Sequence, residues 1–381
     1  MLDAVMRFFR GIGRALRRGA GLVFAWIAWP ILATRGWYSR RGWIIKGPLL
    51  AVVVLFAGLY GYFFWQTQVW TGFDPNFVDA YRFSERTVPA GHELAATAPS
   101  ADAPAGATTA LQCQSSAIVD VVADLTDMNV NDNAWISSML LYRLGLFGIE
   151  WDHTPFLDNK ASFQRGINQA VRRTSVELVD TLARVRGTSG INSNLQDARN
   201  NLQFDEYSWY FGLSPFGPKT PTPSYYRAAI DSFRTFNTEL AACQATFDGR
   251  ADNLVQFLDR IANDLGSTSA ILRERSENHN GGWFDTRGDD RFWFAYGQLY
   301  GYYAVLTAAG ADFSQVVRER NLGPLWRDTL GQFQSALRIQ PAIISNGRED
   351  GWIMPTHLAT MGFYILRVRS NLVEVRSVLD R

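Results

Sequence analysis

The densest group of side chains that could do chemistry lies in the stretch GGWFDTRGDDRFW, at 281–293. This stretch contains three carboxylates and two tryptophans: Asp285, Asp289, Asp290, Trp283 and Trp293. Closely spaced carboxylates can act as general acid and base in glycan hydrolysis, and tryptophan rings can stack on sugars. Carboxylates can also bind Ca²⁺, although this spacing is not that of an EF-hand loop. The three aspartates are therefore candidate catalytic residues.

The same aspartates have a structural explanation. Asp289 or Asp290 can cap a helix that begins near Arg291, because a carboxylate accepts hydrogen bonds from the free N–H groups and suits the positive end of the helix dipole. Capping predicts that each aspartate satisfies a helix end or an arginine. A ligand site predicts instead that at least two carboxylates and a tryptophan line one open cleft. The sequence favours the structural role.

A second polar cluster lies in SNGREDGWIMPTHL, at 345–358, where Glu349, Asp350 and His357 could converge with the aspartates. His357 follows Pro-Thr, and a histidine there more often begins a helix than binds a metal, with Thr356 as the N-cap. The four histidines form no HExxH, and two cysteines are too few for a cysteine-built zinc site. Phosphate-binding loops and nucleophile elbows are also absent from the sequence. We expect no metal and no cofactor.

The two cysteines could form a disulfide. Cys113 lies at the start of the first predicted helix of the large domain, and Cys243 lies on the apolar stripe of a helix predicted at 224–247. A bond between them would persist in an oxidising compartment. Two buried thiols that never meet are the alternative, and the sequence leaves both open.

The elements that must position these residues are mainly helical. A representative stripe recurs at helical spacing: Leu254, Phe257, Leu258, Ile261 and Leu265. Sustained alternation is nearly absent; strand candidates flank the turn-rich NGREDG and predict one small β-hairpin near 342–354. The fold class is therefore mainly α, with one N-terminal transmembrane helix and a multi-helix bundle.

A membrane span is predicted at 47–70. Gly47–Phe73 contains 27 residues without a charge, and tryptophans lie at both ends of its apolar core. Arginines and a lysine precede the span, whereas Asp74 and Asp79 follow it. The positive-inside rule then places the N-terminus in the cytoplasm and the bulk of the chain in the periplasm, on the outer side of a bacterial inner membrane.

Charge divides the chain. Residues 1–46 hold nine Lys/Arg and one acid, and form a basic, amphipathic cytoplasmic segment; whether 19–34 is interfacial or inserted stays open, and a cleaved signal peptide is an alternative. Residues 71–107, rich in Ala, Pro, Ser and Thr towards their end, are predicted to be a flexible tether. Residues 108–381 form the predicted periplasmic domain. Beyond residue 46 there are 28 Lys/Arg against 35 Asp/Glu, an acidic balance that argues against nucleic acid as a partner.

Several stretches resemble a known family. They are DGRADNLVQFLDRIANDLGSTS at 248–269, SWYFG at 208–212, DDRFWFAYGQLYGYYAVL at 289–306, and the chain from SNGREDGWIMPTHL to NLVEV at 345–375. Together they are similar to bacterial inner-membrane proteins of domain-of-unknown-function family 2333. The resemblance implies one N-terminal span and a large non-cytoplasmic domain, and it implies no catalytic residue.

Two functions from different classes follow. The first is a non-enzymatic scaffold, or partner of a cell-envelope complex, held at the lipid bilayer and contacting an envelope protein through aromatic side chains. The candidate contact residues are Tyr207, Trp209, Tyr210, Trp283 and Trp293. The alternative is a cell-wall glycan-binding or glycan-hydrolysing module that uses the Asp/Trp cluster at 283–293.

Overall fold

The computed structural model describes residues 42–94, 111–146, 148–154, 156–184, 190–213 and 216–381. The chain forms two compact units, residues 1–62 and residues 63–381. The basic segment predicted at 1–46 therefore lies almost entirely outside the described residues, and so do the alternatives considered for 19–34.

The first unit is described from the start of helix α2, Trp43–Gln68, which continues into the second unit. Within the described residues, α2 is the one helix that is long and apolar enough to cross a membrane, judged by length and composition alone. Val54, Leu55 and Phe56 are all exposed, and none of the most apolar stretch is buried by protein. A helix that is apolar all round and uncovered by protein has the character of a membrane anchor.

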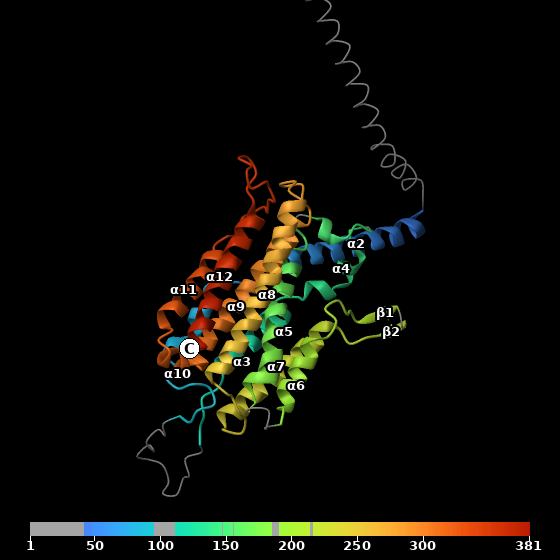
Figure 1. The fold of residues 1–381 in the computed structure, drawn as a ribbon. Helices are drawn as coiled ribbons and strands as arrows, with labels where there is room; N and C mark the ends of the chain where they lie inside the picture. Colours follow the sequence, from blue (N-terminus) through green and yellow to red (C-terminus); the bar gives the residue numbers. More distant parts are fainter. Residues whose placement is uncertain (1–41, 95–110, 147, 155, 185–189, 214–215) are drawn as a thin grey trace, which may run out of the picture. The chain divides into compact units, whose positions relative to one another are not determined.

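The second unit is a helical bundle, as predicted (Figure 1). Its longer helices are α3 (Ala117–Asp127), α5 (Asn159–Glu177), α6 (Ser193–Leu202), α7 (Thr222–Ala241), α8 (Ala251–Asn278), α9 (Gly288–Asp312), α11 (Gly323–Leu337) and α12 (His357–Leu379). Shorter helices include α4 (Leu140–Leu144), the 3₁₀ helix η5 (Trp151–His153) and α10 (Ser314–Glu319).

Helix α9 is the centre of the bundle. It contacts α3, α5, α8, α11 and α12, and its side chains are buried on every side, including Tyr296, Tyr300 and Tyr302. A helix that is apolar around its whole circumference must be covered all round, because no face can be given to water. The largely apolar sequence DDRFWFAYGQLYGYYAVL is therefore typical of a helix at the centre of the core.

Helices α5 and α9 pack closely and approach through glycines. A Cβ added at Gly166 would collide with the carbonyl oxygen of Phe294, and one at Gly297 would collide with that of Phe163. Only hydrogen at these Cα atoms permits the backbones to come this close. The crossing brings the N-terminal turns of α5 and α9 together.

One small hairpin is present, but at another place. Strands β1 (Phe211–Leu213) and β2 (Phe216–Pro218) pair antiparallel, with Gly212 opposite Gly217. The location predicted at 342–354 is wrong, because no strand forms there and the backbone makes only isolated bridges, one of them between Asn346 and Thr356. Asn346 exchanges hydrogen bonds with Gly282, and the His357 N–H donates to the Ser345 carbonyl.

The tether predicted at 71–107 is also corrected. The described part, up to residue 94, packs onto the bundle through the 3₁₀ helices η1 (Phe77–Tyr81) and η2 (Phe83–Glu85). Val78 and Ala90 are buried, and the Phe77 ring stacks on Tyr300 at 4.6 Å. A few spaced aromatic residues are enough to fix this segment, although its average composition is polar. Residues 95–107 lie outside the description.

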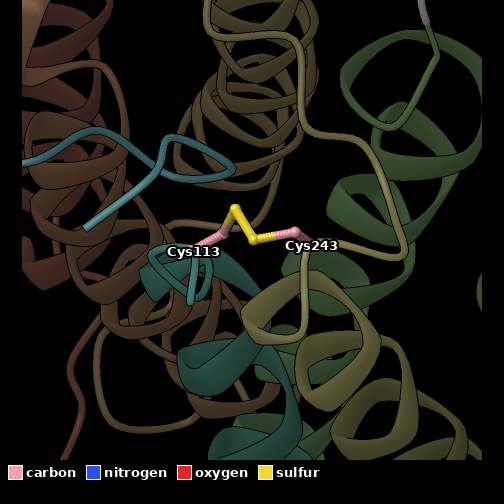
Figure 2. The surroundings of a disulfide bond; sticks show 2 residues. All are labelled: Cys113 and Cys243. Atoms are coloured by element: carbon pink, nitrogen blue, oxygen red, sulfur yellow. A yellow bond between two sulfur atoms is a disulfide. The ribbon is translucent and has the colours of Figure 1, made fainter. Parts of the chain in front are cut away.

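Cys113 and Cys243 form a disulfide, with sulfurs 2.06 Å apart and Cα atoms 5.3 Å apart (Figure 2). Cys113 lies before α3 rather than in a helical turn, and Cys243 lies just beyond α7. The Cys113 N–H donates to the Ala241 carbonyl at 2.9 Å, so backbone pairing already holds the two segments together. Closing so long a loop stabilises a domain by about 2–5 kcal/mol in the chain-entropy account.

Candidate functional site

A partly open cavity of about 880 Å³ lies in the second unit, beside the crossing of α5 and α9. Charged side chains of both signs line it. The acids are Glu150, Asp152, Asp205, Glu206 and Asp290, and the arginines are Arg143, Arg165, Arg287 and Arg291. Trp151, Tyr142 and Tyr207 add aromatic surface. Of the five predicted residues in the Asp/Trp cluster at 283–293, Asp290 alone lines this cavity, and the tryptophan in the wall is Trp151.

Asp290 is held in the wall of this cavity by a hydrogen-bonded chain. The Ser162 hydroxyl donates to Asp290 Oδ1 at 2.7 Å. Arg165 donates to Ser162 Oγ at 2.9 Å and to the Tyr207 hydroxyl at 2.8 Å. These contacts join the first turn of α9 to α5 and to the segment before β1. They fix the orientation of the Asp290 carboxylate.

Two further carboxyl groups lie behind Asp290. Asp158 is 0% exposed and Asp289 is 4% exposed. Among the described residues, no N–H or hydroxyl group of another side chain donates to either carboxyl. An ionised carboxylate is poorly solvated in such a place, so burial favours the protonated acid.

Protonation follows from this burial. Burial, with the neighbouring charges of Asp290 and Asp289, raises the pKa of Asp158 to about 10. Burial, with the charge of Asp290, raises the pKa of Asp289 to about 8. The pKa of Asp290 is also raised by burial. At neutral pH the Asp158 carboxyl therefore keeps its proton, which avoids a second buried charge beside Asp290.

The N-cap prediction for Asp289 and Asp290 is wrong, although both residues do lie at the N-terminal end of the helix. Helix α9 begins at Gly288, which places both residues inside its first turn, and the N-cap residue Arg287 makes no side-chain cap. Asp285 takes the structural role instead, because it accepts the Arg287 N–H at 3.3 Å and bonds to Arg275 and Asn346. Burial opposes ionisation of Asp285, but the hydrogen bonds from Arg275 and Asn346 outweigh it and lower the pKa.

The other predicted residues are scattered. Tyr207 lines the cavity, Trp209 is half-buried, and Tyr210 and Trp283 are exposed. Trp293 is partly buried and packs against Trp70 and Tyr296, with ring centroids 5.1 and 5.3 Å apart.

The second polar cluster does not converge on the site. Asp350 is exposed and pairs with Arg348, and Glu349 is also exposed. His357 accepts a hydrogen bond from the Ser345 N–H at its Nδ1, 2.9 Å away, and begins α12. Burial lowers the pKa of His357, so it is neutral and serves as a local backbone anchor.

One group of side chains at the cavity rim has the spacing of metal ligands. Donor atoms of Glu150, Asp152 and His153 all lie within 4.8 Å of one another. However, the Arg287 guanidinium lies 3.2 Å from Asp152 and 3.3 Å from His153 Nε2. An arginine already supplies the positive charge there, and we assign no metal to this group.

Residues 123–281 match the model of a family described as "uncharacterized protein conserved in bacteria" (domain of unknown function 2333). This is the family that the sequence resembles. No curated protein and no solved structure gives a significant match. The family 2333 match begins within α3 and ends just beyond α8, so it includes Asp158 and Arg165 but stops before Asp290.

The sequence reasoning missed the α5 side of the site, which lies within the family 2333 match. Asp158, Ser162 and Arg165 are spaced by four and three residues, so they follow one face of a helix. That spacing was a usable signal. It resembles the polar face of any amphipathic helix, which normally faces water, and only the packing of α9 against α5 buries it.

Proposed function

We propose that this chain is a membrane-anchored protein of the bacterial envelope whose large unit binds cell-wall glycan in the cavity at Asp290. The composition of the cavity wall carries the proposal. Four arginines and five acids line it, so positive and negative charge nearly balance. Such a wall discriminates against polyphosphates and against polycations, and it favours a neutral, strongly hydrogen-bonding ligand.

A glycan presents many hydroxyl and amide groups that both donate and accept hydrogen bonds. The cavity supplies fixed donors in Arg165 and Arg287 and fixed acceptors in Asp290 and Asp152. It also supplies flat apolar surface, since Tyr142 and Tyr207 lie nearly parallel with ring centroids 6.4 Å apart. Aromatic faces beside charged hydrogen-bonding groups suit the apolar faces and the polar edges of sugar rings.

The location supports this ligand. The basic residues before α2 and the acidic balance after it favour a cytoplasmic N-terminus and a large unit in the periplasm, anchored in the inner membrane. The disulfide between Cys113 and Cys243 fits that compartment, because the reductants of the cytoplasm would keep both cysteines as free thiols. Cell-wall glycan is abundant there.

A second candidate function is docking of an envelope protein, and the hairpin β1–β2 favours it. Tyr210, Phe211 and Phe216 are exposed on this short projecting element. Aromatic side chains of this kind commonly anchor protein interfaces. Because these residues do not line the cavity, the two functions can be separated by mutation.

Titration calorimetry of the full chain in detergent, with soluble peptidoglycan disaccharides of N-acetylglucosamine and N-acetylmuramic acid, tests the proposal. Tyr207→Ala and Asp290→Asn should weaken binding about tenfold or more, which corresponds to about 1.4 kcal/mol each. The matched control is Tyr210→Ala, which removes a nearby aromatic ring outside the cavity and should leave glycan affinity unchanged.

Absence of glycan binding by the folded protein would contradict the proposal, and so would equal losses in Tyr207→Ala and Tyr210→Ala. If Tyr210→Ala instead abolished capture of an envelope protein while no glycan bound, the docking function would replace it. Release of shorter sugar products during the titration would extend binding to hydrolysis.

A further inference from the structure

Two loops of the second unit carry large apolar side chains that protein does not cover. Trp283 (53% exposed) and Phe284 (83%) lie between α8 and α9, and Trp352 (92%) and Ile353 (64%) lie between α11 and α12. We name these four residues the aromatic knob. Single exposed apolar residues are common, but four on neighbouring loops indicate an interaction surface.

The knob is built on a fixed base. The Gly282 and Asn346 backbones exchange hydrogen bonds of 2.9 and 3.1 Å, which ties the two loops together. Gly282 also lies directly against the Met354 side chain, and the buried Asn346 amide donates to Asp285 at 2.8 Å. Both loops project at the same end of the bundle (Figure 1). The four side chains are therefore presented together.

Contacts within the second unit connect this base to the residues that follow the apolar run of α2. Arg287, at the end of the α8–α9 loop, pairs with Asp152 in η5 at 3.2 Å. Trp151, the residue before Asp152, packs on Phe63 in the last turns of α2, with ring centroids 4.8 Å apart. The knob base and the exit of the apolar helix are thus linked by two consecutive contacts.

Only a few residues separate the end of the apolar part of α2 from the first residues that pack on the helical bundle. Trp65 is exposed, as a residue at a membrane interface would be, and Trp70, five residues later, already stacks on Phe163 at 5.0 Å. Five residues reach at most about 18 Å even when extended. A bilayer that holds α2 is therefore always within reach of the unit, at high effective concentration.

We propose that the aromatic knob inserts into the interface of the bilayer that α2 crosses, and so gives the large unit a second membrane contact. Tryptophan, phenylalanine and isoleucine at loop tips suit the boundary between headgroups and acyl chains. Charges around the knob are mixed, with Arg348 beside Glu349 and Asp350. Insertion is therefore driven by apolar burial rather than by attraction to anionic lipid. This inference does not depend on glycan binding.

The test uses the full chain in phosphatidylcholine nanodiscs that hold one copy each, which excludes contact with a second copy. Both native cysteines are bonded, so a single introduced thiol can carry a nitroxide label. Trp352→Cys and Phe284→Cys report from the knob. The control is Thr238→Cys, on the exposed face of α7 near its C-terminal end, remote from the knob (Figure 1).

Electron paramagnetic resonance then compares collision of each label with oxygen, which concentrates in lipid, and with a water-soluble nickel chelate. The knob labels should show several-fold lower nickel accessibility and higher oxygen accessibility than the Thr238 label. Equal nickel accessibility at all three positions, in protein with unchanged circular dichroism, would overturn the proposal and leave the knob as a surface for a protein partner.

Discussion

Asp158 and Asp289 place two carboxyl groups where water barely reaches them, directly behind the partly buried Asp290. Asp285, only a few residues away, bonds to Arg275 and Asn346, but Asp158 and Asp289 gain no such donor among the described residues. Buried carboxyls without donors reduce stability, so their presence indicates a use other than folding. Their raised pKa values keep protons close to the cavity at neutral pH, beside the Asp290 carboxyl in its wall.

The first prediction is that Asp289→Asn stabilises the protein. The folded state raises the pKa of Asp289 from 3.8 to about 8, so it disfavours the ionised form, and the cost of ionisation grows as pH rises through that window. The amide has the same shape and no charge. Thermal unfolding should give a melting temperature a few degrees above that of the unmodified chain at pH 8, with little difference near pH 4.

Asp285→Asn is the matched control for that prediction. The pKa of Asp285 is lowered, so its ionised form stabilises the fold above its ordinary range and this contribution fades as the solution becomes acidic. Asp285→Asn should therefore lower the melting temperature at pH 8, in the opposite direction. A lower melting temperature for Asp289→Asn at pH 8 would show that its carboxylate has a stabilising partner.

At the scale of elements, the crossing of α5 and α9 holds the site together. Ser162 and Asp290 meet because the helices touch at Gly166 and Gly297, which leave no room for a side chain. The cavity therefore depends on two residues that do no chemistry. Their contribution is to let two backbones approach, which larger residues would prevent.

Gly297→Ala tests this dependence. The new methyl group would meet the Phe163 carbonyl oxygen, and overpacking of this kind costs about 1–3 kcal/mol. The variant should unfold at lower denaturant concentration and, because Asp290 shifts relative to Ser162, bind glycan more weakly. Gly331→Ala in α11 is the control, since open space surrounds that position and alanine should stabilise the helix by up to about 1 kcal/mol. Equal stability of the two variants would refute close packing at Gly297.

For the whole molecule, the distribution of charge predicts its topology. Nine basic residues precede residue 47, and the remaining chain has more acids than bases. Basic segments stay in the cytoplasm during insertion, so the large unit should lie on the other side. A reporter that works only in the periplasm should be active when fused after Arg381 and inactive when fused after Lys46. Activity of a cytoplasm-only reporter at Arg381 would reverse the assignment.

The membrane helix and the core-facing helices could be predicted from local composition and periodicity. An apolar run without charge requires a helix that water does not surround, and a stripe of core residues such as Leu254 and Ile261 requires a helix with one buried face. These follow from properties of neighbouring residues, so no distant contact can change them. The family resemblance also rests on the sequence alone, and the match of residues 123–281 to the family 2333 model confirms it.

Which residues of the site contact one another depends on long-range packing. Asp289 and Asp290 were found in the sequence but were predicted to be caps, because their burial against α5 depends on Gly166 and Gly297 more than a hundred residues apart. Residues 71–94 have the composition of a tether, but Phe77 stacks on Tyr300 of α9 and fixes them to the bundle. The stretch at 342–354 forms no strand, and Asn346 makes isolated bridges with both Gly282 and Thr356. Long-range packing sets the solvation of each carboxyl and the partner of each backbone group, and neither is encoded in the local pattern that surrounds them.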